Sequence, residues 1–201
     1  MNIATTGQTG GPSVSKTSTC LKVVETLNDR MRSTPIEKVK VTDLCRSAKI
    51  SRATFYEYFQ DIFDVATWMW DYLMGETLYQ AGVRYGCYDA HLAKFRKLRE
   101  YREFFANAFK AVGSLSITQH GGRMMTEHLQ QVFERKAGRK MTHHEALQVE
   151  FFITGAKHMT RHWAERSMVD EPEEMAAIFT ENMPAFILPY LEPEEDAGAQ
   201  R

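Results

Sequence analysis

Residues 36–63, IEKVKVTDLCRSAKISRATFYEYFQDIF, decide the fold of this chain. They combine a predicted helix start at residues 42–43, a tight break at residues 48–50 and a second helix start at Ser51. The positions that would face one another across the break are apolar: Leu44, Ala48, Ile50, Phe55 and Phe59. Two short helices with apolar facing positions can pack at a steep angle, so the stretch predicts a helix-turn-helix.

The second predicted helix gathers polar and aromatic side chains at its N-terminal end. Thr42 and Ser51 carry hydroxyl groups that can accept hydrogen bonds from free backbone amides, so both are expected N-caps. A helix that enters the major groove of DNA meets base edges with its N-terminal residues. An ordinary helical hairpin would explain the apolar positions but not this clustering. The outward positions of the second helix are Arg52, Ala53, Thr54, Tyr56 and Tyr58.

The run VTDLCRSAKISRATFYEYFQDIFDV resembles the N-terminal domain of TetR-family transcriptional regulators, in spacing and residue type together. The resemblance implies a homodimer that binds a palindromic operator in double-stranded DNA, with a helical C-terminal domain that takes a small-molecule effector. It implies a ligand-responsive repressor, since repression is the usual mode of the family. Carried over by position, Arg52, Ala53 and Thr54 would touch bases. The positions that would touch phosphates are Thr42, Ser51, Tyr56 and Tyr58, with Lys40 and Lys49 adding charge nearby.

Two positions depart from the family pattern. Lys49 stands where the family usually has Gly in the turn, and a left-handed backbone there is mildly costly for any other residue. Ile62 stands where the family often has a lysine that holds a phosphate. Because each phosphate contact adds to affinity, its loss leaves more of the binding to Lys40, Lys49 and Arg46. These departures keep open an alternative function, a TetR-fold effector-binding protein or coregulator without an operator of its own.

Composition and charge agree with a DNA-binding head on a globular chain. The 201 residues are 43% hydrophobic with a net charge of −1. From Lys16 to Gln60 there are nine Lys and Arg against five Asp and Glu, whereas the other residues have 16 against 21. The excess positive charge therefore lies in the predicted reader, where it would steer DNA toward one end of the molecule.

Cysteine usage and hydropathy indicate a cytoplasmic protein. Cys20, Cys45 and Cys87 are odd in number and widely spaced, which is typical of a reduced compartment and offers no zinc or redox pair. The sequence has no apolar run of the roughly 20 residues that a membrane helix needs, and its start lacks a signal-peptide pattern. We expect a disordered arm over residues 1–15 and a disordered tail over residues 193–201.

The rest of the sequence is helical in pattern, so the predicted fold class is all-α. We expect a three-helix DNA-binding domain over residues 16–60 and a helical effector-binding and dimerisation domain over residues 61–192. A helix longer than twenty residues is expected from Asp61 to near Gly82 or Gly86, linking the two domains. Further helices are expected over residues 88–112, 116–136, 142–167 and 172–191.

The last two predicted helices carry more apolar surface than a monomer of this size would leave exposed. Pairing them with their copies in a second chain would form a four-helix interface, which is where TetR-like proteins dimerise. The alternative is that some of these residues form the core of their own chain. The expected interface residues are Phe152, Gly155, Met159, Trp163, Ile178, Phe179, Met183 and Phe186.

Aromatic, methionine and histidine side chains in the C-terminal domain suit an apolar effector pocket, although such stripes are more often plain core. The pocket candidates are Trp68, Met69, Tyr72, Phe105, Phe109, Met124, His128, Phe151, His158 and His162. His158 and His162 have metal-ligand spacing, but no carboxylate or thiolate completes a set, so we expect no metal. We expect no cofactor and no enzymatic activity, because hydrolase, phosphate-loop and dinucleotide motifs are absent from the sequence.

Overall fold

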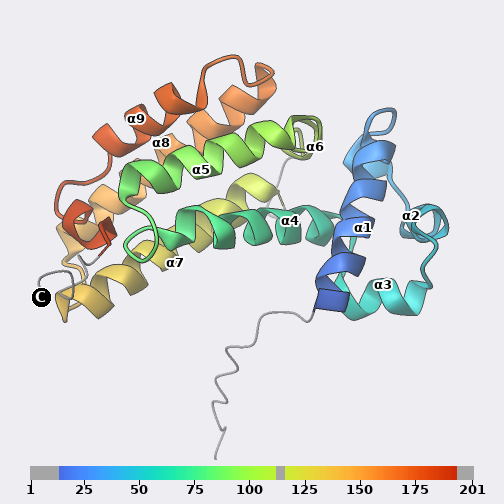
Figure 1. Cartoon of the computed structure of the whole chain (residues 1–201), viewed down its shortest axis with the longest axis horizontal. Coiled ribbons are helices and arrows are strands. Elements are labelled where there is room, and N and C mark those ends of the chain that lie inside the picture. The colour runs from blue at the N-terminus through green and yellow to red at the C-terminus, as the bar shows by residue number, and fades with distance from the viewer. Residues whose placement is uncertain (1–13, 112–115, 194–201) are drawn as a thin grey trace, which may run out of the picture.

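The computed structural model describes residues 14–111 and 116–193, and helices dominate both ranges (Figure 1). The predicted all-α class is confirmed. A small head of three helices stands at one end of the molecule, and a larger helical body extends from it along the long axis (Figure 1). Most of the expected arm and tail falls outside the described residues, although residues 14 and 15 already belong to the first helix.

The head consists of α1 (Val14–Met31), a short 3-10 helix η1 (Ile36–Lys38), α2 (Val41–Ala48) and α3 (Arg52–Tyr58). Its apolar side chains meet in one core, as the sequence pattern predicts. The head residues that are almost fully buried include Cys20, Val23, Val24, Leu27, Met31, Leu44, Phe55 and Phe59. Lys49 ends α2 in the left-handed conformation, with φ of 53° and ψ of 46°, so it does occupy the backbone geometry that usually selects Gly.

Helix α4 (Ile62–Glu76) joins the head to the body (Figure 1). It begins at Asp61, whose carboxylate accepts a hydrogen bond from the Asp64 amide at 2.9 Å. The expected length was wrong, because α4 ends after 15 residues. Thr77 leaves helical geometry and donates its hydroxyl proton to the Leu73 carbonyl at 2.7 Å. Gln80, in the 3-10 helix η2 (Leu78–Gln80), donates from its side-chain amide to the Gly75 carbonyl at 2.6 Å. Side chains therefore satisfy carbonyls that a longer helix would have paired.

The body packs its helices as neighbouring pairs. Helix α5 lies along α9, α7 lies along α8, and α4 contacts both α7 and the head helix α1 (Figure 1). This arrangement places one end of α4 in the core of the head and its middle in the core of the body. The body helices are α5 (Cys87–Glu100), α6 (Arg102–Ala108), α7 (Ile117–Ala137), α8 (His143–Glu165), α9 (Pro172–Glu181) and the 3-10 helix η3 (Leu188–Leu191).

Two of the expected body helices are interrupted. The segment expected as one helix over residues 88–112 breaks at Tyr101 into α5 and α6, with no Gly or Pro in the sequence to signal the break. The segment expected over residues 172–191 leaves the α-helix after Glu181. Pro184 and Pro189 explain the second break, since proline lacks the N–H that a continuing helix would use. Among the described residues, no helix is long and apolar enough to cross a membrane.

Candidate DNA-binding surface and internal cavity

The N-terminus of α3 is capped and exposed. Ser51 Oγ accepts a hydrogen bond from the Thr54 amide at 2.9 Å and lies 2.8 Å from Thr54 Oγ1, so Ser51 is the N-cap that the sequence predicts. Thr42 is not a cap. Helix α2 starts one residue earlier, at Val41, with Lys40 at the cap position and no side-chain cap bond. Thr42 is instead an exposed residue of the first turn of α2.

None of the predicted DNA-contacting side chains is fully buried in the head core. Arg52, Ala53 and Tyr56 are exposed on α3, and the Arg52 guanidinium lies 5.8 Å from the centre of the Tyr56 ring. Thr54 and Tyr58 are half-buried. The remaining candidates, Lys40, Thr42, Lys49 and Ser51, are exposed at the ends of α2 and α3. The structure therefore brings the nine residues together around one helix pair, with seven of them exposed.

Two residues near this surface have structural roles. Ile62 is only 6% exposed and packs in the core between α4 and the head, so it cannot reach a phosphate. Arg30, which the sequence pattern did not single out, donates from Nη2 to Ser47 Oγ at 2.6 Å and so ties α1 to the C-terminal half of α2. A basic residue in the last turn of a predicted helix, facing another helix, is the signal that could have found it.

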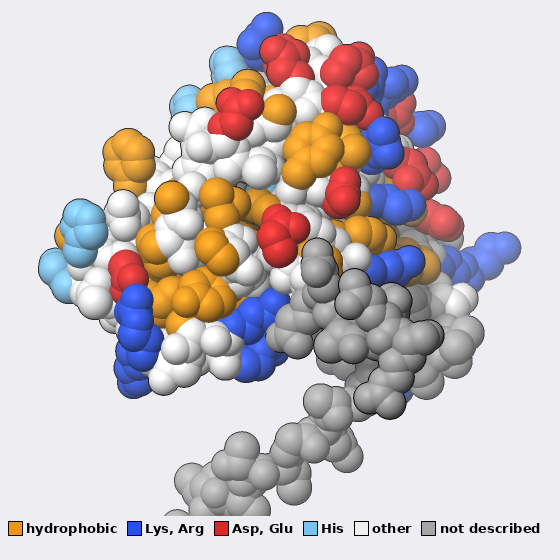
Figure 2. Space-filling view, turned by 60° about the vertical axis from the view of Figure 1, so that its left-hand side comes forward, with side chains coloured by type: hydrophobic (Ala, Val, Ile, Leu, Met, Phe, Trp, Pro, Cys, Tyr) orange, Lys and Arg blue, Asp and Glu red, His pale blue; other side chains and the backbone are white. Residues whose placement is uncertain are grey.

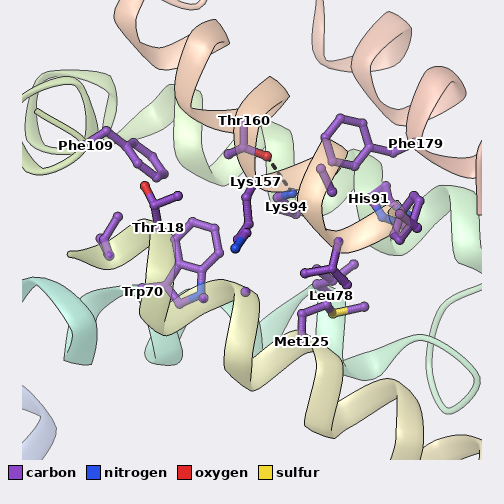
Figure 3. Close-up of a pocket in the computed structure, with 16 residues that line it drawn as sticks. Trp70, Leu78, His91, Lys94, Phe109, Thr118, Met125, Lys157, Thr160 and Phe179 are labelled. Atoms are coloured by element: carbon purple, nitrogen blue, oxygen red, sulfur yellow. Dashed lines mark hydrogen bonds between the residues drawn. The ribbon is translucent and has the colours of Figure 1, made fainter. Parts of the chain in front are cut away.

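A cavity lies inside the body, between α4, α5, α7, α8 and α9 (Figure 3). The centre of a water molecule could occupy about 40 Å³ of it, and the empty space around it, which includes open solvent, is about 470 Å³. Phe109, at the end of α6, also lines it. Most of its wall is apolar, whereas its polar lining residues are Thr118, Thr160, His91, Lys94 and Lys157. Its apolar walls, with a few polar groups among them, are typical of a site for a small organic molecule.

Lys94 is the most unusual side chain of the cavity, because it is only 4% exposed. Its ammonium lies 3.3 Å from Thr160 Oγ1 and within 4.4 and 4.6 Å of the ring centres of Phe95 and Phe179. Burial lowers the pKa of Lys94 to about 7. His91, one turn earlier, donates from Nδ1 to the Cys87 carbonyl at 2.9 Å. Burial and the nearby Lys94 lower the pKa of His91 to about 3, so the imidazole is neutral near pH 7.

Two consecutive glycines of α7 make room for cavity side chains. A Cβ on Gly121 would lie 2.8 Å from the Trp70 indole, and a Cβ on Gly122 would collide with the stem of Lys157. Figure 3 shows the Lys157 side chain extending toward Trp70, while Thr160, on the same helix, is hydrogen-bonded to Lys94. Gly121 and Gly122 therefore let an indole from α4 and a lysine from α8 share the space over α7.

Most of the residues predicted to line an effector pocket do not line this cavity, which corrects the sequence-based prediction. Phe109 lines the cavity, whereas the other nine candidates do not belong to its described lining. Met69 and Phe105 are fully buried core residues, and Trp68 stacks on Tyr72 at 5.4 Å near the head. Their apolar character serves packing, not a cavity wall. Met124 is half-buried on α7, and His128 packs against Tyr79 at 4.8 Å between ring centres.

The outward face of α8 holds the remaining pocket candidates. Phe151 is 86% exposed, and His158 and His162 stack on the same helix at 6.0 Å between ring centres. None of the three reaches the cavity, because the face of α8 that does reach it carries Phe152, Ile153 and Lys157 instead. Among the described residues, no group of three or more His, Cys, Asp and Glu side chains is placed to hold a metal ion.

The predicted dimer residues divide into a buried and an exposed group. Phe152, Trp163, Phe179 and Met183 are each covered by their own chain, which corrects the expectation that they form an intermolecular contact. Phe186 is half-buried and packs edge-on against Phe133. The exposed group consists of Gly155, Met159 and Ile178.

The exposed group continues into a longer apolar stripe. Leu147, Phe151, Gly155 and Met159 recur every four residues along one face of α8, and Ile178 of α9 is also exposed. We call these five residues the α8–α9 stripe. A Cβ added at Gly155 would meet no atom within 4 Å, so this part of the surface is open. Figure 2 shows hydrophobic side chains and histidines next to one another on the surface of the body.

Comparison with known proteins finds similarity to transcriptional regulators. Residues 88–184 match a family described as the transcriptional regulator C-terminal region, TetR_C_8. The HTH-type dhaKLM operon transcriptional activator DhaS of Lactococcus lactis subsp. lactis (strain IL1403) is 29% identical over 87 residues. These matches support the interpretation of the chain as a TetR-family transcriptional regulator. The match to DhaS covers 43% of this chain and 46% of DhaS, so it spans less than half the length of that relative.

Two solved structures share the TetR fold with this chain. The dihydroxyacetone kinase operon activator DhaS has a TM-score of 0.54 at 17% identity, covering 86% of this chain and 96% of that structure. The TetR-family repressor AlkX from Dietzia sp. strain DQ12-45-1b, implicated in the biodegradation of n-alkanes, has a TM-score of 0.51 at 17% identity. That match covers 90% of this chain and 97% of AlkX. At these identities the two structures show the fold of a TetR-family regulator and no more.

Proposed function

We propose that this chain is a ligand-responsive TetR-family regulator that binds a palindromic operator as a homodimer. The observation that carries the proposal is the exposed N-terminal end of α3, where Ser51 caps the helix and Arg52 lies over the Tyr56 ring. Helix N-termini and arginines are suited to phosphates and base edges. Arg52, Ala53 and Thr54 would meet bases, while Thr42, Ser51, Tyr56, Tyr58, Lys40 and Lys49 would position the backbone.

The α8–α9 stripe supports dimerisation. TetR-family regulators dimerise, and this stripe offers exposed apolar side chains on α8 and α9, the two helices expected from the sequence to form the interface. Gly155 at its centre would let a partner helix approach closely. A two-fold dimer presents two copies of α3, and such pairs read half-sites about one DNA turn apart, roughly 34 Å.

The cavity supports effector control, because two of its lining residues, Trp70 and Phe109, belong to or follow helices that contact the head. Trp70 belongs to α4, whose N-terminal end packs in the head core. Phe109 follows α6 and packs edge-on against Trp70 with 6.0 Å between ring centres. Helix α6 also touches the head, through an ion pair of 3.0 Å between Arg32 and Glu103. A ligand that displaces Trp70 would bias the position of α4, and through it α3, relative to the body.

We propose release of the operator on effector binding, which makes the chain a repressor. A second candidate is a coregulator without its own operator. The buried Ile62 favours that candidate, since it removes the position where the family often has a phosphate-holding lysine. The relative DhaS is named an activator, so an activator is the third outcome for the sign of regulation.

A mobility-shift experiment with DNA flanking the gene of this protein tests the proposal. We expect saturable retention of the wild type at low salt, and a loss of affinity of about tenfold or more in Arg52→Ala. Arg166→Ala is the matched control, because Arg166 is an exposed arginine of the body, and it should bind as the wild type does. Equal binding by Arg52→Ala and Arg166→Ala would exclude α3 as the reader. No retention of any flanking DNA would favour the coregulator.

A further inference from the structure

We infer that the body cavity binds an organic monocarboxylate, whose carboxylate pairs with Lys94 while its hydrocarbon part fills the apolar remainder. This inference rests on the proposed function, because it names the chemical class of the effector. Of the pocket residues expected from the sequence, only Phe109 is among the described residues that line this cavity.

The first observation is a buried cation without an acidic partner. Lys94 is 4% exposed, and its contacts are the Thr160 hydroxyl at 3.3 Å and the faces of Phe95 and Phe179. A buried ammonium is costly unless an anion pairs with it. Burial is the cause that lowers the pKa of Lys94, and no carboxylate opposes it. The cavity therefore holds a site that an incoming anion would stabilise.

The second observation is that every titratable side chain in the described lining of the cavity is basic. These groups are His91 and Lys94 from α5 and Lys157 from α8, while α4, α7 and α9 contribute none to the described lining. Lys157 Nζ lies 3.4 Å from Gln119 Oε1, so an amide, and not a carboxylate, is its neighbour. No Asp or Glu is among the described residues that line the cavity. Two lysines and no acid favour a ligand that brings negative charge.

The third observation is an unpaired hydrogen-bonding group. Thr118 Oγ1 is buried and has no hydrogen-bond partner within the part of the chain that the structure describes. Thr118 also lines the cavity (Figure 3). Buried hydroxyl groups are normally paired, so an unpaired one beside a cavity is available to hydrogen-bond a ligand. A polar atom of the ligand, or a water molecule that it holds, would complete this group.

The apolar walls decide between classes of anion. Leu78, Ile117, Met125, Phe152, Ile153 and Ala156 supply most of the remaining surface. A small inorganic anion would lose its hydration against these walls without gaining contacts, whereas a hydrocarbon chain or ring gains by leaving water. A carboxylate on an apolar body satisfies both parts of the cavity.

Calorimetric titration of the full chain tests the inference without DNA. The probes are the straight-chain acids from butanoate to octanoate and benzoate, each compared with the alcohol and amide of the same skeleton. We expect at least one acid to bind about tenfold or more tighter than its amide, because hydrogen bonds to charged groups are the stronger ones. Lys94→Met should abolish this preference. Lys97→Met, which changes an exposed lysine of the same helix, should keep it.

Proton uptake provides a second readout that a merely structural role for Lys94 would not move. At pH 8, titrations in two buffers of different ionisation enthalpy should reveal uptake of close to one proton on binding, since a carboxylate restores the charge of Lys94. Lys94→Met and Lys94→Gln should take up none. Circular dichroism confirms that each variant is folded before it is titrated.

Three results would overturn the inference. They are no binding of any acid, equal affinity for acid and amide, or an unchanged preference in folded Lys94→Met. Borohydride trapping of an aldehyde on Lys94, without acid binding, would replace it with a carbonyl ligand. Failure of the proposed function is separate, because it is measured by the mobility shift: DNA retention without acid binding refutes only the carboxylate, and acid binding without DNA retention refutes only the operator.

Discussion

Lys49 ends α2 in a backbone conformation that its side chain disfavours. Its φ of 53° is left-handed, and its side chain is exposed, so a substitution there removes no packing. We expect Lys49→Gly to raise the free energy of unfolding by about 0.5–1 kcal/mol, because glycine adopts this conformation without steric cost. Urea denaturation measures the change.

Lys49→Ala is the control for that prediction. It removes the same charge but keeps a Cβ, so it should not stabilise the protein. If alanine and glycine stabilise equally, the benefit comes from removing the charge and not from the backbone. In DNA binding the two variants should lose similar affinity, because both lose the same cation near the operator.

Lys94 makes stability depend on pH, in the direction opposite to that of a lysine whose pKa is raised by a carboxylate. Its pKa is about 7 in the folded chain and near its usual higher value when unfolded. Between these values the unfolded chain binds the extra proton, so the free energy of unfolding rises with pH, by up to about 1.4 kcal/mol per unit. Below pH 7 both states are protonated and the full cost of the buried charge is present.

Replacing Lys94 with an apolar side chain should therefore stabilise the protein most at low pH. We expect Lys94→Met to unfold at higher urea concentration than the wild type at pH 6, with the difference shrinking by pH 9. Urea denaturation at the two pH values checks this. A difference that is constant with pH would show that Lys94 keeps its charge in the folded chain.

At the scale of single residues, sequence reasoning found Ser51 and missed Lys94. Ser51 was predictable because capping is local, set by a hydroxyl before a helix start. Thr42 failed as a cap because α2 begins one residue earlier than its pattern indicates. Lys94 could not be recognised as buried until α8 and α9 are packed over α5. The clue in the sequence is a lysine placed between Ala90 and Leu98 on the apolar face of α5.

Among the elements, α7 carries two consecutive glycines, Gly121 and Gly122, which lie against different side chains. A Cβ at Gly121 would press on the Trp70 ring, which is 7% exposed and packed on Phe105 and Phe109. A Cβ at Gly122 would press on the flexible stem of Lys157. We expect Gly121→Ala to lower the free energy of unfolding by about 1–3 kcal/mol, which is the usual cost of overpacking.

Gly122→Ala should cost less, because Lys157 can swing toward solvent and alanine favours a helix by about 1 kcal/mol over glycine. Thermal unfolding of the two variants provides the comparison. The order would be reversed if Trp70 rather than Lys157 were the side chain free to move. Gly75→Ala, on α4 with no atom within 4 Å of an added Cβ, is the reference for the helix term alone.

The elements themselves were more predictable in kind than in length. The caps Ser51, Asp61, Ser116 and Thr142 start helices where local chemistry indicates. At the end of α4, the side chains of Thr77 and Gln80 donate hydrogen bonds to carbonyls of the preceding turn. The periodicity of apolar residues does not reveal these bonds. The assignments of Phe151 to the pocket and Phe152 to the dimer interface were wrong for a similar reason, since Phe152 lines the cavity and Phe151 is exposed. Neighbours on a helix differ by about 100° in direction, so a small phase error exchanges exposed and buried residues.

For the whole molecule, the α8–α9 stripe predicts a dimer whose strength depends on Phe151. This side chain is 86% exposed, so Phe151→Glu should leave the fold of each chain intact while placing a charge in the interface. We expect sedimentation analysis to find a monomer for this variant and a dimer for the wild type. Val83→Glu, at an apolar position that is 62% exposed outside the stripe, should remain dimeric. Dissociation of both variants, or of neither, would move the interface elsewhere.

In the proposed complex, two α3 helices, held apart by this dimer, read a symmetric DNA site. Selection of bound sequences from a random duplex pool by the full chain tests it most directly. We expect enrichment of a palindrome whose half-sites are centred about one DNA turn apart, roughly 34 Å, and loss of enrichment in Arg52→Ala and Phe151→Glu. Failure of the wild type to enrich any sequence, or enrichment of a single half-site without symmetry, would contradict it.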